Sequence, residues 1–175
     1  VVNSASRGKA EDFLALLRKS LGTLPVASVS PDRDVSELMT NWVIDADRMD
    51  GVLSKAFIPL DEAHFAAIGD NNAASMVKNH ELDSKEVMSI IDGGQYVAKL
   101  AIGYEDAMTF MLHDDLSIKR IKFSDVIQEQ NDDIYSDDKL AKLDADFALM
   151  AGELNLMISA LHAEFLVSAT DYLES

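Results

Sequence analysis

The sequence contains no cysteine and no long apolar run. Without cysteine the chain forms no disulfide, carries no thiol nucleophile and builds no zinc site on Cys ligands, which fits a cytoplasmic protein. No segment approaches the roughly 18 apolar residues of a membrane span, and no signal peptide opens the chain, so no membrane partner is expected. The start at Val1-Val2-Asn3, without an initiator Met, suggests a fragment of a longer protein.

Basic residues are scarce beside acidic ones: 15 Lys and Arg stand against 31 Asp and Glu, a net charge of −16. The imbalance is uneven, because residues 1–60 carry 7 cations and 8 anions whereas residues 124–175 carry 2 cations and 12 anions. So acidic a surface repels phosphates, and we expect no non-specific DNA binding by the C-terminal part alone. Apolar residues make up 48 %, which is enough for a packed core and argues against disorder.

Two helices are expected in the first 60 residues. Apolar residues recur at helical spacing between Lys9 and Leu21, and Gly22 follows as a natural stop. A second, shorter helix is expected over residues 38–42, where Asp34 or Ser36 is placed to cap its start.

The middle of the chain mixes strands and loops with one helix. Residues 45–72 have irregular patterning, and residues 73–78 have the composition of a strand. Asp83 and Glu86 have the spacing of a capping box, which predicts a helix start, and the pair Gly93-Gly94 predicts its end.

Three strands with short connections follow, over residues 96–102, 108–112 and 116–123, which is the pattern of an antiparallel meander. The third strand alternates imperfectly, which an edge position or a bulge would explain. We therefore predict an α+β fold, an antiparallel β-meander packed with helices and followed by a long C-terminal helix. In the first strand, one face is expected to carry Tyr96, Ala98, Leu100 and Ile102.

Lys119, Arg120 and Lys122 place three cations within four residues of the third strand, against the trend of the whole chain. Such a cluster indicates a contact surface for something anionic. In a regular strand Lys119 and Arg120 point to opposite faces, so at most two of the three share one surface. The alternative interpretation is protection of an exposed sheet edge against aggregation.

The last helix, expected over about residues 136–165, carries a heptad pattern. Packing along a sheet or a neighbouring helix of the same chain explains this pattern, and so does a seam between two subunits. The residues that recur every seven positions are Leu140, Phe147, Leu154 and Leu161, and Leu143, Met150 and Met157 interleave at an offset of three.

No residue pattern indicates catalysis. The adjacent acidic pairs point apart in any regular structure, and the four histidines lack metal-ligand spacing. There is no Gly-rich phosphate loop and no nucleophile elbow. We therefore predict no catalytic residue, no metal and no cofactor.

Several segments share a family pattern in matching order and spacing from about residue 8 to residue 161. They are residues 9–12, 14–22, 24–26, 38–43, 82–87, 114–123 and 143–154. The two strongest are residues 143–154 and Asp114-Asp115-Leu116-Ser117-Ile118-Lys119-Arg120-Ile121-Lys122-Phe123. Through them the chain resembles the RdgC family of bacterial recombination-associated DNA-binding proteins. Family members are longer, and this chain looks like their C-terminal half or slightly more.

The resemblance implies a non-enzymatic homodimer closed into a ring, with duplex DNA passing through a positively lined hole and bound without regard to sequence. It also implies a nucleoid-associated protein that antagonises a RecA-type recombinase. The family's denser basic run before residues 82–87 is reduced here to Lys78, near a ring-closing tip. The candidate DNA contacts are Lys78, Lys119, Arg120 and Lys122, and the candidate dimer interface is Leu140, Phe147, Leu154 and Leu161.

We expect one compact unit of a larger, ring-forming protein. Residues 1–60 form a helical and extended part continuing from a missing N-terminal half, residues 61–135 a helix plus the meander, and residues 136–175 the C-terminal helix. The alternative is an acidic oligomerisation or protein-interaction module that does not bind DNA by itself. The net charge and the heptad pattern favour that alternative.

Overall fold

The computed structural model describes residues 6–26, 33–44, 56–67, 74–129 and 139–165, together with the single positions 2, 4 and 31. The chain divides into two compact units, Val1–Ser30 and Pro31–Ser175. None of the helices in these described stretches is long and apolar enough to cross a membrane.

The first unit contains α1 (Arg7–Leu21), a helix with no buried residue. Ser6 caps its start by accepting a hydrogen bond from the Lys9 backbone N–H, and Gly22 follows its end with a φ of 78°. A positive φ favours glycine, which explains why the helix stops there. The predicted helix is confirmed, with its start two residues earlier.

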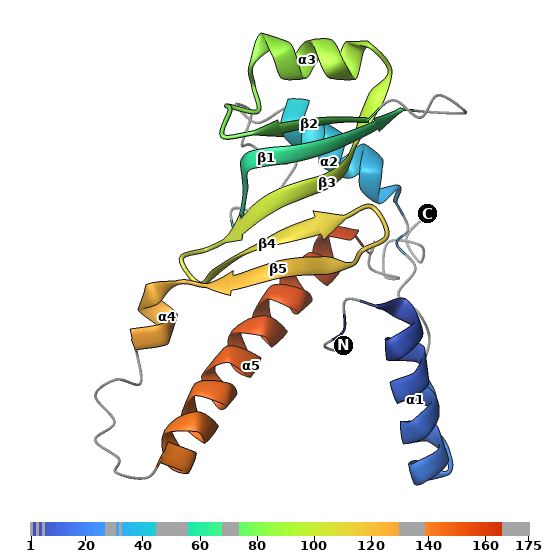
Figure 1. Cartoon of the computed structure of the whole chain (residues 1–175), viewed down its shortest axis with the longest axis vertical. Helices are drawn as coiled ribbons and strands as arrows, with labels where there is room; N and C mark the ends of the chain where they lie inside the picture. Colours follow the sequence, from blue (N-terminus) through green and yellow to red (C-terminus); the bar gives the residue numbers. More distant parts are fainter. Residues whose placement is uncertain are drawn as a thin grey trace, which may run out of the picture. The chain divides into compact units, whose positions relative to one another are not determined.

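The second unit is built on one antiparallel sheet of five strands, in the order β2-β1-β3-β4-β5 (Figure 1). The predicted meander is confirmed as its last three strands, and β5 lies at the edge. The predicted strand at residues 73–78 is also confirmed, as β2 at the opposite edge. The bounds are β1 (Phe57–Ala67), β2 (Ala74–Lys78), β3 (Gln95–Tyr104), β4 (Met108–His113) and β5 (Ile118–Phe123).

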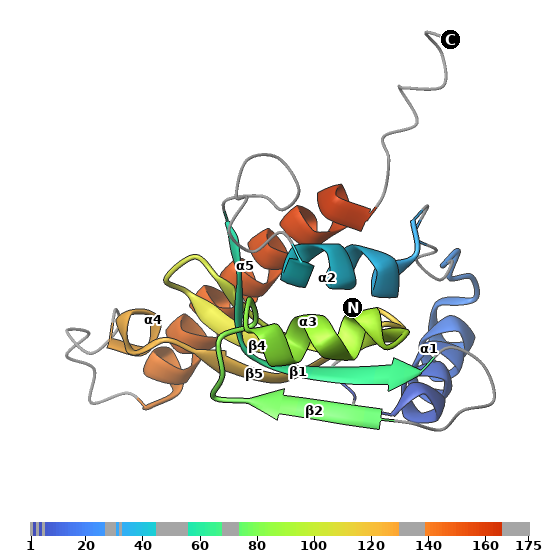
Figure 2. The same cartoon turned by 90° about the horizontal axis from the view of Figure 1, so that it is seen from above.

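Helices cover one face of this sheet, as the view from above shows (Figure 2). Their buried side chains join those of the sheet in one hydrophobic core, which includes Trp42 and Phe165 with ring centroids 5.6 Å apart. The α+β fold and the long C-terminal helix are therefore confirmed. The helices are α2 (Val35–Ile44), α3 (Lys85–Asp92), α4 (Asp125–Glu129) and α5 (Lys139–Phe165).

The cap of α2 is Asp34, whose carboxylate accepts from the backbone N–H groups of Ser36 and Glu37. These two bonds and a third from the Ser36 hydroxyl hold the pKa of Asp34 below its usual value, the hydroxyl contributing most. Of the two predicted caps, Asp34 is therefore the one that acts. The predicted start of the last helix near Ser136 lies outside the described residues.

Two local predictions are wrong. Ser84, not Asp83, caps α3, because its hydroxyl accepts from the backbone N–H of Val87 and the capping box with Glu86 does not form. In β3, the pairing with β1 shifts between Lys99 and Val97, which leaves Ala98 as an extra residue. The shift reverses the alternation, so Val97 rather than Tyr96 joins the core.

Candidate nucleic-acid interface

The sheet face opposite the core collects most of the basic side chains of this part of the chain. Between residues 56 and 129 the sequence has six Lys and Arg, and five of them lie on this face while Lys85 belongs to α3. We call this surface, with its imidazoles, the open face: Lys78, Lys99, Lys119, Arg120, Lys122, His64 and His113. The register that places them together is Glu62↔Lys78, His64↔Met76, His64↔Lys99, Lys99↔His113, Ala101↔Met111, Met111↔Lys119 and Thr109↔Lys122.

A bulge in β5 explains why all three cations of this strand share one face. The pairing with β4 moves from Met111↔Lys119 to Thr109↔Lys122, so two residues of β5 stand opposite one residue of β4. Arg120 occupies the bulge with a φ of 54°. The prediction that at most two of these cations share a surface is therefore wrong, whereas the predicted edge position and bulge are both confirmed.

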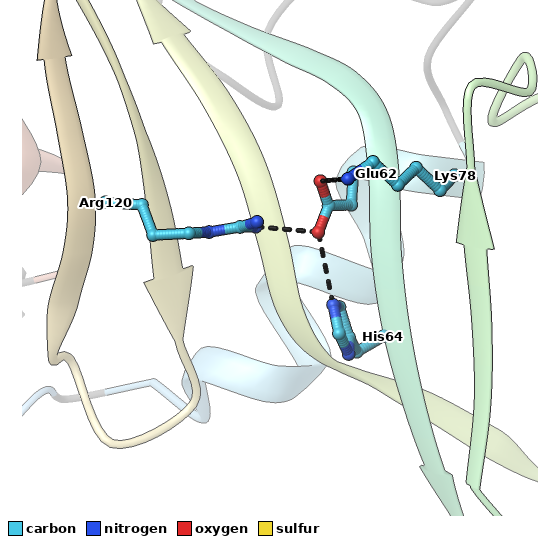
Figure 3. Close-up of polar contacts among 4 residues, drawn as sticks. All are labelled: Glu62, His64, Lys78 and Arg120. Atoms are coloured by element: carbon cyan, nitrogen blue, oxygen red, sulfur yellow. Dashed lines mark hydrogen bonds and ion pairs between the residues drawn. The ribbon is translucent and has the colours of Figure 1, made fainter.

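At the centre of the open face, Glu62 contacts three basic side chains from three strands (Figure 3). Arg120 Nη2 of β5 donates to Glu62 Oε1 at 2.7 Å, His64 Nε2 of β1 lies 3.3 Å from the same oxygen, and Lys78 Nζ of β2 lies 3.6 Å from Oε2. The hydrogen bond from Arg120 is the main reason why the pKa of Glu62 lies below its usual value. One carboxylate on β1 thus links side chains from both edge strands.

Two shallow hollows of about 270 and 350 Å³ flank this network, and Arg120, Glu62 and Met111 line both of them. Met111 is only 2 % exposed although it lies outside the main core, which places an apolar floor under the charged groups. Asp61 lines the first hollow, so this end of the face also carries an acid.

His113 lines the second hollow between Lys99 and Lys119. Burial lowers the pKa of His113, and the charges of Lys119 and Lys99 lower it further. Its imidazole is therefore mostly neutral at pH 7 and adds little to the positive charge of the face. Among the residues that the structure describes, no three His, Asp or Glu side chains are placed to hold a metal ion.

The structure thus brings all four predicted DNA-contact residues, Lys78, Lys119, Arg120 and Lys122, onto one surface. Sequence reasoning missed Lys99, although its neighbour Leu100 was assigned to the apolar face and adjacent strand residues point to opposite sides. It considered the histidines only as possible metal ligands and did not place His64 or His113 at this surface.

Comparison with known proteins gives the family. A family model described as "Putative exonuclease, RdgC" matches residues 1–167. The chain is 55 % identical over 174 residues to the "Recombination-associated protein RdgC" of Colwellia psychrerythraea, covering 99 % of this chain and 55 % of the relative. The chain belongs to the RdgC family.

Other RdgC proteins give the same picture. The protein of Proteus mirabilis is 46 % identical over 158 residues, which cover 90 % of this chain and 51 % of the relative. The protein of Mannheimia succiniciproducens is 43 % identical over 164 residues, which cover 94 % and 52 % respectively. The chain therefore spans about half the length of the curated RdgC relatives that it matches, and their names associate them with recombination.

The heptad residues of α5 in this RdgC chain divide into two groups. Leu161 is 6 % exposed and belongs to the chain's own core, and Leu154 packs against that core. In contrast, Leu140 is 75 % exposed and Phe147 is 71 % exposed. The C-terminal half of the pattern thus serves packing within the chain, and a subunit seam stays a prediction for the N-terminal half.

Proposed function

We propose that this RdgC chain binds duplex DNA through its open face, without reading sequence, and thereby modulates recombination without catalysing a reaction. The observation that supports the proposal is the concentration of five of six neighbouring cations on one sheet face of a protein with a net charge of −16. The names of the relatives associate them with recombination, in which duplex DNA is the substrate.

Phosphate neutralisation is the mechanism that these residues can perform. Each Lys or Arg that contacts a phosphate releases condensed counterions, which gives affinity that depends on salt and not on base sequence. The acidic residues of the C-terminal part repel DNA, which favours encounters at the open face. A protein on the duplex in this way would restrain a RecA-type recombinase by competing for DNA, and would associate with the nucleoid.

We further propose that two chains assemble into a ring-shaped homodimer around the duplex. The exposed apolar side chains on the first half of α5, with Leu143 64 % and Phe147 71 % exposed, supply a self-complementary stripe at heptad spacing. A second chain doubles the number of phosphate contacts, which compensates for the small number of cations on each open face.

Two alternative functions can be distinguished from DNA binding by experiment. An oligomerisation module that does not hold DNA is favoured by the same apolar stripe. A nuclease is suggested by the words "Putative exonuclease" in the family description. Titrating DNA without and with Mg²⁺, and then checking the length of the DNA, separates these alternatives from simple binding.

The test is fluorescence anisotropy of two labelled duplexes of unrelated sequence, titrated with the chain between 50 and 200 mM salt. The double variant Lys119→Ala/Lys122→Ala removes two cations and leaves the Arg120–Glu62 contact in place. Both duplexes should bind it about tenfold or more weakly, and the slope of log K against log salt should flatten by about 1.8. Lys85→Ala on α3 is the control and should leave affinity nearly unchanged; equal losses in the two variants, or a wild-type chain that fails to bind at 50 mM salt, would overturn the proposal.

A further inference from the structure

Glu62 is an acid placed at the centre of a basic surface, and its surroundings are those of a bound anion. Its side chain is 16 % exposed and receives a guanidinium, an imidazole and an ammonium group within 3.6 Å. Both carboxylate oxygens are engaged, Oε1 by Arg120 and His64 and Oε2 by Lys78. Guanidinium and ammonium groups are also the groups that bind phosphate oxygens, since carboxylate and phosphate accept from the same donors.

We propose that the Glu62 carboxylate occupies the position of a DNA phosphate and restrains DNA binding by competing with the backbone for Arg120 and Lys78. This inference rests on the function proposed above and specifies how the same site is regulated. Glu62 is then an intramolecular competitor, and it limits the affinity of an otherwise strongly basic face.

The exposure of the partners allows such an exchange. The side chains of Arg120 and Lys78 are 52 % and 53 % exposed, so each can move to a phosphate without disturbing the core. Glu62 itself is mostly covered and stays in place. Its lowered pKa keeps the carboxylate charged at neutral pH, and the competition therefore persists under ordinary conditions.

The competition has a measurable consequence for salt dependence. While Arg120 and Lys78 remain paired with Glu62, they neutralise no phosphate and therefore release no counterions from the DNA. Only Lys99, Lys119 and Lys122 then contribute fully, for a slope of log K against log salt of about −2.7 per chain. With Glu62 neutralised, all five cations contribute, and the slope becomes about −4.5.

Glu62→Gln is the variant that tests this, because glutamine keeps the size and an acceptor oxygen but carries no charge. The matched control is Glu86→Gln on α3, which makes the same change in net charge at an exposed position on a helix of the covered side. In fluorescence anisotropy with a labelled duplex, Glu62→Gln should bind at least tenfold more tightly at 50 mM salt. Its affinity should fall about 500-fold between 50 and 200 mM, against about 40-fold for the wild-type chain and the control.

A second experiment, in the Arg120→Ala variant, tests whether Glu62 acts through Arg120. In Arg120→Ala, adding Glu62→Gln should tighten binding by a smaller factor, because one of the two masked cations is already missing. Glu62→Ala should act in the same direction as Glu62→Gln, which covers the case in which the amide disturbs local packing.

The outcomes separate the two proposals. If the wild-type chain binds DNA and Glu62→Gln binds no more tightly than Glu86→Gln, Glu62 positions Arg120 for binding and the competition is refuted. If neither the wild-type chain nor Glu62→Gln binds at 50 mM salt, the DNA-binding function itself fails. If Glu62→Gln binds more tightly and with a steeper salt dependence than the wild-type chain, and Glu86→Gln does not, both the DNA-binding function and the competition are supported.

Discussion

Arg120 combines a left-handed backbone with a charged side chain, and its replacement by glycine or by alanine should reveal the conformational cost of the bulge. Its φ of 54° lies in the region that an L-residue enters at a cost of about 1–2 kcal/mol. Glycine enters that region freely. Both replacements remove the same ion pair with Glu62, so their difference reports the backbone alone.

The magnitude follows from two opposing contributions. In an ordinary strand, glycine is less stable than alanine by roughly 0.5–1 kcal/mol because it loses more conformational freedom on folding. At position 120 the relief of the left-handed strain outweighs that loss. We expect Arg120→Gly to be more stable than Arg120→Ala by about 1 kcal/mol, the reverse of the usual order.

The assay is urea unfolding at pH 7 of both variants and of the pair Lys119→Gly and Lys119→Ala. Lys119 lies one residue earlier and is absent from the positive-φ positions of the described chain, so alanine should be the more stable replacement there. A difference of about 1 kcal/mol corresponds to about 2–4 °C in Tm for a chain of this size. Arg120→Ala as stable as Arg120→Gly would refute the left-handed bulge, and both variants should lose DNA affinity equally.

Two further predictions concern α5 and His113. Phe165→Ala should lower the free energy of unfolding by about 3–5 kcal/mol, because Phe165 is 2 % exposed against Trp42, and the fluorescence of this single tryptophan reports the unfolding. Phe147→Asp on the same helix should cost the monomer less than about 0.5 kcal/mol while abolishing the self-association seen by sedimentation velocity; a dimer that persists would refute the seam. His113 has a lowered pKa, so the unfolded chain binds its proton more readily, and stability is lost as the pH falls below about 6.5. His113→Gln should therefore lose less stability than the wild-type chain between pH 7 and pH 5 in urea unfolding.

Sequence reasoning predicted the regular elements because their signals are local. Gly22 ends α1 with a positive φ, Gly93 directly follows the last residue of α3, and short turns join the three strands of the meander. The error at Asp83 also comes from a local signal. Asp83 and its neighbour Ser84 are both residue types that cap helices, and only the backbone geometry decides which of them does so.

The site was only partly predictable, because its decisive features are not local. Assigning alternate residues to opposite faces assumes a regular strand. The bulge at Arg120 breaks this alternation, so the residues of the strand after it lie on the face opposite to the one predicted. Nothing in the local pattern marks an arginine for a positive φ. The contact between Arg120 and Glu62 joins residues 58 positions apart, and it depends on the order of four strands.

The heptad pattern of α5 runs through two different environments, one buried and one exposed. The same spacing places Leu161 in the core and leaves Phe147 exposed, because only the last part of the helix packs against the core. Periodicity identifies the apolar side of a helix, but the length of the surface opposite determines where burial ends. A helix longer than the surface that it covers necessarily presents the remainder of its stripe to another partner or to water.

The net charge of −16 and a DNA-binding role are compatible because electrostatic interactions in salt are local. At physiological ionic strength the Debye length is about 8 Å, so a phosphate at the open face responds to the cations beneath it far more than to acids on the opposite side. Those distant acids oppose approach by other faces and favour one orientation. Glu62 is different, because it lies within ion-pair distance of two of the five cations and is not screened from them. One carboxylate at the centre of the face therefore changes DNA affinity more than many carboxylates on the helices, and the comparison of Glu62→Gln with Glu86→Gln measures that difference directly.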